Sequence, residues 1–71
     1  ENNDVWKVHQ RAYKKYFARI RSGLMTKGEF EVWSRQAADL RDAALERYAR
    51  AKNEEDRQRI AAELEEELNR P

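Results

Sequence analysis

The chain of 71 residues is long enough for one small domain, and it carries 41% charged and 39% hydrophobic residues with a net charge of +1. The absence of cysteine excludes a disulfide scaffold, a cysteine-based zinc finger and a thiol redox site. Two glycines and one proline offer little turn chemistry for short strands, so the composition predicts an all-α protein. No apolar run reaches the roughly 18 residues of a membrane-spanning helix, and no signal-peptide pattern is present. We therefore expect a cytoplasmic location.

Charge is distributed unevenly along the chain. Residues 5–27 hold seven cations and no acid, whereas residues 28–52 hold five cations and five acids. Residues 53–71 hold three cations against seven acids. The basic first segment and the acidic last segment should attract each other in a compact fold.

A first helix is predicted over residues 4–22. At about 100° per residue, its apolar side chains fall within one arc of roughly 180°, and its cations occupy the other side. Asn2, Asn3 or Asp4 is suited to cap its start, and Gly23 is suited to end it. The apolar arc consists of Val5, Trp6, Val8, His9, Ala12, Tyr13, Tyr16, Phe17 and Ile20.

The segment from Met25 to Phe30 carries the clearest signal for a helix start. Thr26 as the N-cap puts Glu29 at the capping-box position, and Met25 and Phe30 then occupy the two positions of a hydrophobic staple. A second helix is therefore predicted over residues 27–52. The turn before it is so short that the first two helices should form an antiparallel hairpin. The apolar stripe of the second helix consists of Phe30, Trp33, Ala37, Leu40, Ala44, Tyr48 and Ala51.

A third helix is predicted over residues 54–69. On one continuous helix, Ile60 and the leucines after it would lie nearly opposite the stripe that ends at Ala51, because nine residues at 100° each leave the two stripes about half a turn apart. A break at Asn53, a favourable N-cap, lets both stripes face one core. The expected fold is a small three-helix bundle, a single helical module that we expect to be a fragment of a longer protein. The expected core consists of Trp6, Tyr13, Phe17, Ile20, Leu24, Phe30, Trp33, Leu40, Ala44, Tyr48, Ile60 and Leu64.

Few side chains suit catalysis. His9 is the single histidine, and a histidine within an apolar arc is usually a packing residue. Glu63 and Glu67 are four residues apart, but they have no nearby histidine to complete a metal site, and the chain has no glycine-rich phosphate loop. We therefore expect no enzyme activity, no cofactor, no metal and no small-molecule substrate.

The cations of the first helix form a basic face without an interleaved carboxylate, which is a pattern that suits a phosphate backbone. Nucleic-acid binding through this face is the alternative function, although Gln10 is the only base-reading side chain near it. The simpler interpretation is that the cations are solvated or pair with the acidic third helix. The candidate basic face consists of Lys7, Arg11, Lys14, Lys15, Arg19 and Arg21.

Long amphipathic helices with large aromatic side chains, in a chain too small to bury all of them, favour a non-enzymatic protein-interaction module. The candidate interface aromatics are Trp6, Trp33 and Tyr48. Aromatic residues flanked by cations are also typical of membrane-surface helices, but the aromatic residues of the second helix offer these side chains a packing partner. The leading hypothesis is a module that binds a partner protein or forms a homo-oligomer.

Helix-cap and core residues between Tyr16 and Asp42 carry a sequence resemblance. They are Tyr16-Phe17-Ala18-Arg19, Gly23, Met25-Thr26, Glu29-Phe30, Trp33 and Leu40-Arg41-Asp42. In these residues the chain resembles C-terminal helical segments of uncharacterised proteins from intestinal Gram-positive bacteria, which often carry a cysteine-rich segment upstream. That segment is absent here, so the resemblance implies no zinc site. It implies a bacterial module from a longer protein and transfers no functional residue.

Overall fold

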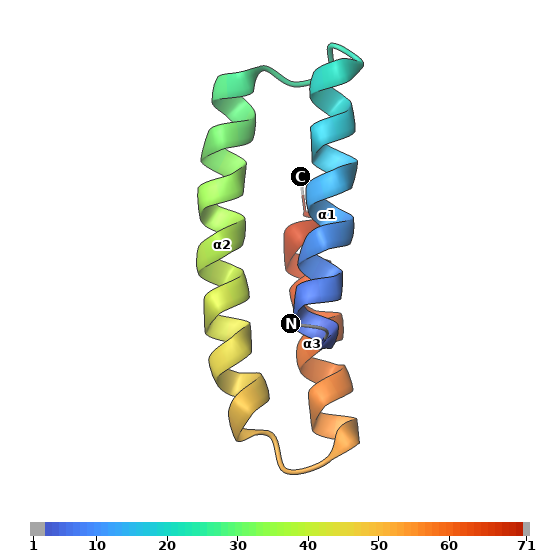
Figure 1. Cartoon of the computed structure of the whole chain (residues 1–71), viewed down its shortest axis with the longest axis vertical. Coiled ribbons are helices and arrows are strands. Elements are labelled where there is room, and N and C mark those ends of the chain that lie inside the picture. Colours follow the sequence, from blue (N-terminus) through green and yellow to red (C-terminus); the bar gives the residue numbers. More distant parts are fainter. Residues whose placement is uncertain (1–2, 71) are drawn as a thin grey trace.

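The computed structural model describes residues 3–70, which form three helices and no strand. They are α1 (Asp4–Arg21), α2 (Lys27–Arg50) and α3 (Glu54–Leu68). Figure 1 shows α1 and α2 as an antiparallel hairpin, with α3 behind α1 and displaced away from the α1–α2 loop. Each helix packs against the other two. The all-α three-helix bundle predicted from the sequence is confirmed.

The helix starts follow the predicted capping residues. The Glu29 N–H donates to the Thr26 hydroxyl at 3.1 Å, and the Thr26 N–H donates to the Glu29 carboxylate at 2.9 Å, which completes the capping box. At the start of α1, the Asn3 side chain accepts a hydrogen bond from the Trp6 N–H at 3.0 Å. Asn3 is therefore the N-cap of α1, whereas Asn2 lies outside the described residues.

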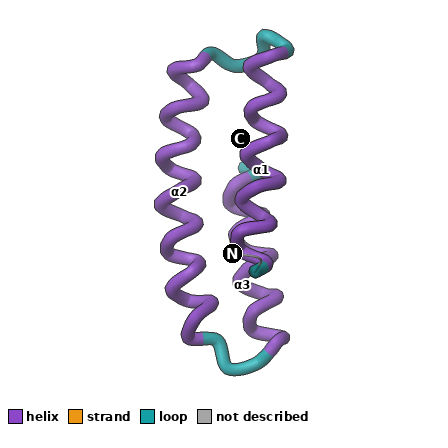
Figure 2. The backbone as a smooth tube through the Cα atoms, in the orientation of Figure 1, coloured by secondary structure: helices purple, strands orange, loops and turns teal. Residues whose placement is uncertain are grey.

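Two loops connect the helices at opposite ends of the bundle (Figure 2). The first contains Gly23, whose positive φ of 78° suits a residue without Cβ. There the Gly23 N–H donates to the Ile20 carbonyl at 3.1 Å, and the Leu24 N–H donates to the Arg19 carbonyl at 2.8 Å. This pair of bonds is a Schellman motif, so α1 ends in the conformation that its sequence favours.

The second loop separates α2 from α3 at residues 51–53. Ala51 is extended, and the Asn53 side chain accepts from the Asp56 N–H at 2.8 Å. Because of this break, Ala44 on α2 and Ile60 on α3 are both buried in one core, as the phase argument predicted. The helices end one or two residues earlier than their expected limits of residues 22, 52 and 69.

The core lies where the three helices meet, and small or aliphatic residues fill it. Alanines on all three helices let the backbones approach closely, and the leucines of α3 fill the space between them. Half-buried Trp33, Leu40 and Tyr48 pack against this cluster. The buried cluster consists of Val5, Val8, Ala12, Ala37, Ala44, Ile60, Ala61, Leu64 and Leu68.

Three residues expected in the core are exposed instead. Tyr13, Phe17 and Leu24 keep 40%, 47% and 77% of their surface, so the prediction was wrong for them. Arg11 contacts α3 and Lys15 contacts its C-cap Asn69, and residues two positions further along a helix point about 200° away from them. Tyr13 and Phe17 therefore point away from α3. The apolar arc of about 180° is wider than the part of α1 that its two neighbours cover.

Candidate functional site

A row of aromatic rings follows the seam between α1 and α2 on the side away from α3. We call this row the aromatic face, and its members are Trp6, His9, Tyr13, Phe17 and Phe30. Ring centroids lie 6.1 Å apart from Trp6 to His9 and from His9 to Tyr13. Phe30 of α2 meets Tyr13 at 5.2 Å and Phe17 at 6.0 Å, both in T-shaped geometry. The rings thus form one row of contacting side chains about 16 Å long.

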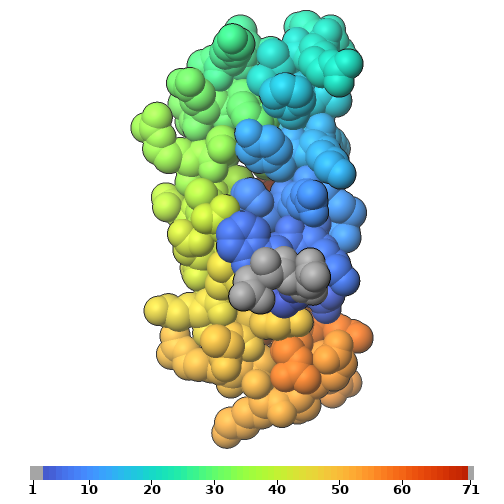
Figure 3. Space-filling model, viewed as in Figure 1, coloured from blue at the N-terminus to red at the C-terminus, as the bar shows by residue number. Residues whose placement is uncertain are grey.

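The aromatic face becomes more open toward the α1–α2 loop. Phe30 at its base is buried, but Tyr13 and Phe17 are about half exposed. Leu24, in the loop itself, is the most exposed large apolar side chain of the described residues. In Figure 3, which has the viewpoint of Figure 1, side chains of α1 (blue) and α2 (green to yellow) meet along most of the seam. The row is therefore a packed set of rings, of which Tyr13 and Phe17 keep exposed surface.

The neighbouring aromatic pair is closed. Tyr16 stacks on Trp33 with centroids 4.3 Å apart and ring planes 7° from parallel. The Arg19 guanidinium lies 4.5 Å from the Tyr16 ring centre, in a cation–π arrangement. Tyr16 is buried although the sequence-based core omitted it. This pair, unlike Tyr13 and Phe17, belongs to the interior of the bundle.

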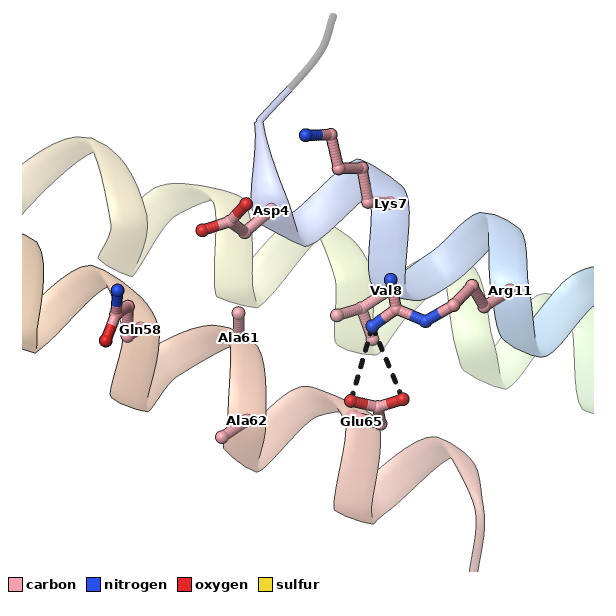
Figure 4. A pocket seen from close by; sticks show the side chains of 8 residues that line it. All are labelled: Asp4, Lys7, Val8, Arg11, Gln58, Ala61, Ala62 and Glu65. Atoms are coloured by element: carbon pink, nitrogen blue, oxygen red, sulfur yellow. Dashed lines mark hydrogen bonds and ion pairs between the residues drawn. The ribbon is translucent and has the colours of Figure 1, made fainter.

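The predicted basic face divides into two sets of side chains. Arg11 forms an ion pair with Glu65 at 3.3 Å, and Lys15 donates to the Asn69 side chain at 2.7 Å. Figure 4 shows the Arg11 guanidinium reaching from α1 to the Glu65 carboxylate on α3. With Arg19 against an aromatic ring, three of the six cations are directed toward their own bundle.

The other three cations are exposed and form a straight row. Lys7, Lys14 and Arg21 are spaced by seven residues, which places them on one side of α1 at intervals of about 10 Å. Within residues 3–70 none of them has an ion-pair partner. Lys14 and Arg21 are also the i−3 and i+4 neighbours of Phe17 on the helix surface. They therefore border the aromatic face.

The three candidate interface aromatics lie at separate places. The Arg41 guanidinium lies 4.5 Å from the Trp6 ring centre, so one side of Trp6 is covered. Trp33 belongs to the closed stack, and Tyr48 packs half-buried against the core. Sequence reasoning missed Tyr13 and Phe17 as surface residues. Helix length could have indicated their exposure. With 15 residues, α3 is too short to cover the whole length of a hairpin whose α2 has 24 residues.

His9 lies between Trp6 and Tyr13 in the aromatic face. Partial burial, with help from the nearby Arg41 guanidinium, lowers the pKa of His9 below its ordinary value of 6.5, and Asp42 opposes this effect. His9 therefore packs as a partly buried ring between its two aromatic neighbours. This is the packing role that the sequence predicted.

The concave sites on this bundle are open hollows, and one of about 380 Å³ lies beside Arg47, Arg50 and Arg59 where α2 and α3 meet. An open hollow of about 220 Å³ lies between α1 and α3 around Val8, Ala61 and the Arg11–Glu65 pair (Figure 4). In the part of the chain that the structure describes, no three His, Asp or Glu side chains are grouped to hold a metal ion. None of the helices between residues 3 and 70 combines the length and apolarity that a membrane crossing requires.

Comparison with known proteins identified a family. The full length of the chain, residues 1–71, fits a family described as a family of unknown function (DUF6076). No curated protein and no solved structure matches the chain. The sequence thus belongs to the DUF6076 family.

Proposed function

We propose that the chain is a non-enzymatic interaction module that binds a partner protein, or a second copy of itself, through the aromatic face. The observation that carries this proposal is the exposure of Tyr13 and Phe17, 40% and 47%, on neighbouring turns of α1 and in contact with the same Phe30 ring. Contiguous exposed apolar surface is typical of interaction sites, and aromatic side chains dominate the binding energy of many interfaces.

The competing explanation is that these rings serve the fold alone through their contacts with Phe30. Replacing Phe17 with serine separates the two explanations. Because the ring is half exposed, Phe17→Ser should lower the free energy of unfolding by no more than about 1 kcal/mol. The matched control is Tyr16→Ala on the same helix, which removes a buried ring and should cost about 3 kcal/mol or more. Equal losses in urea unfolding would contradict the proposal.

Self-association is one form of this module, and sedimentation equilibrium tests it. A mass that rises with protein concentration in the wild-type chain, but not in Phe17→Ser, would support a homo-oligomer formed through the aromatic face. A monomer at every concentration would remove self-association and leave binding to another protein.

Nucleic-acid binding is the second candidate function, supported by the exposed row of Lys7, Lys14 and Arg21. Three phosphate contacts give a log–log salt slope of about −2.7 on duplex DNA. The double change Lys14→Glu and Arg21→Glu should weaken binding to all sequences equally, because phosphate contacts carry no base information. Fluorescence anisotropy with labelled oligonucleotides tests this, and no binding at micromolar protein at low salt would contradict it.

Further predictions from the sequence accompany these proposals. They are a bacterial origin, a cytoplasmic location, a position within a longer protein, and the absence of catalysis and cofactors. The aromatic face requires none of them, so each stands or falls separately from the interaction proposal.

A further inference from the structure

The charges beside the aromatic face restrict what can dock on it. Lys14 and Arg21 flank Phe17, and Lys27 begins α2 next to the exposed loop. Residues 5–28 contain no carboxylate at all. An occupant of this surface therefore meets exposed rings bordered by positive charge along α1, and it gains affinity if the side that faces α1 carries carboxylates beside an apolar stripe.

A second copy of the chain meets the same requirement poorly. In a symmetric dimer the same patch of both copies faces itself, so the cations beside one aromatic face would approach those beside the other. Like charges opposed across an interface cost affinity and slow association. Of the two forms of the proposed module, the charges favour binding to a different protein.

The bundle already contains one example of the favoured partner. Helix α3 is acidic and amphipathic, and it packs on the other flank of α1. Its Leu64 and Leu68 are buried, while its Glu65 pairs with Arg11. Each flank of α1 thus combines an apolar surface with a border of cations, and an acidic helix occupies one of them.

We infer that the aromatic face binds an acidic amphipathic helix of another protein, in an arrangement that resembles the packing of α3 on α1. This inference rests on the proposed function and specifies the partner's chemistry. Exposed rings beside cations also suit single-stranded nucleic acid, so the test below includes DNA as a competing occupant.

The test uses a synthetic peptide of about 18 residues, with leucines at helical spacing on one face and glutamates on the other. In the matched peptide, lysine replaces every glutamate. Anisotropy of the labelled peptides against the wild-type chain should show the acidic peptide binding at least about tenfold more tightly. Its affinity should fall as salt rises from about 50 to 500 mM, since the flanking charges are exposed.

Protein variants locate the site. Lys14→Glu with Arg21→Glu should weaken the acidic peptide by about tenfold or more, and Phe17→Ser should weaken it comparably. The control is Lys52→Glu, which makes one such charge reversal at an exposed position in the loop between α2 and α3 and should leave the affinity nearly unchanged. Circular dichroism checks that each variant is folded.

Equal binding of both peptides, or equal effects of the Lys52 change and the changes beside Phe17, would overturn the inference. The inference would also be overturned if duplex or single-stranded DNA competed with the acidic peptide and bound Phe17→Ser as tightly as the wild type. The proposed function would survive those results if Phe17→Ser loses no more than about 1 kcal/mol of stability. If that variant loses as much stability as Tyr16→Ala, the proposed function fails as well.

Discussion

The two flanks of α1 differ in the side chains that they present and in what covers them. Toward α3, α1 offers Val8 and Ala12, and small side chains let the two helices pack closely around Leu64. Away from α3, the same helix offers Tyr13 and Phe17, whose rings stand on Phe30 and remain half exposed. One apolar arc in the sequence thus forms a closed core surface and an open surface. We infer that the first holds the fold together and the second is available to a partner.

The strongest test of the closed flank is Leu64→Ala. Leu64 is 1% exposed, and truncating such a leucine typically costs about 2–5 kcal/mol. A chain of this size has roughly 3–5 kcal/mol of stability in all, so the variant should be largely unfolded by circular dichroism at 25 °C. As a control, Val32→Ala on the outer side of α2, where Val32 is 55% exposed, should change stability by less than about 0.5 kcal/mol. If both variants stayed folded with similar urea midpoints, the core would be assigned wrongly.

The loop end of the open flank depends on the capping box that starts α2. Thr26→Ala removes the acceptor for the Glu29 N–H and should lower the free energy of unfolding by about 1 kcal/mol. Thr26→Ser keeps the hydroxyl and should retain most of that stability. Urea unfolding of both variants measures the difference, and identical losses would show that the hydroxyl does not support the helix start.

The ion pair between Arg11 and Glu65 is expected to contribute less. Both side chains are about half exposed, so a double-mutant cycle with Arg11→Met and Glu65→Gln should give a coupling of only about 0.2–1 kcal/mol. The coupling should shrink in about 1 M salt because exposed charges are screened. A larger coupling that resists salt would mean that α3 is held by charge rather than by its leucines.

The smallest expected effect is the pH dependence contributed by His9. Its pKa is lowered in the folded chain, mainly by partial burial, so the unfolded chain binds a proton more readily. The contribution of His9 to stability is therefore complete above its unfolded pKa of 6.5 and is lost as the pH falls below that value. Urea midpoints at about pH 7.5 and 5.5 measure this effect. Between these two pH values the wild type should lose more stability than His9→Gln. If acidification instead stabilised the wild type relative to His9→Gln, the pKa of His9 would be raised in the folded chain, which would contradict this assignment.

Local chemistry made most of the fold predictable. The Thr26–Glu29 capping box, the Asn53 cap and the phase of the apolar stripes located two helix starts and the break between α2 and α3. Such signals depend on residues within one or two turns of each other. Exposure of Tyr13 and Phe17 could not be read in the same way, since it depends on where a third helix lies and how far it reaches.

The candidate site shows the same limit. The sequence identified the cations of α1, but it could not show that Arg11, Lys15 and Arg19 turn toward their own bundle while Lys14 and Arg21 remain free to border Phe17. These directions depend on tertiary packing. Helix periodicity alone gives the order of side chains around α1, and the neighbours decide which of them stay exposed.

The most direct test of the central claim measures the exposure of two tyrosine rings on α1. Photochemically induced dynamic nuclear polarisation enhances the NMR signals of solvent-accessible tyrosines. We expect a strong enhancement for Tyr13 and almost none for Tyr16, followed by loss of the Tyr13 signal when the acidic peptide is added. A Tyr13 ring that is silent in the free chain, or that stays fully enhanced at saturating peptide, would contradict an open aromatic face that binds an acidic helix.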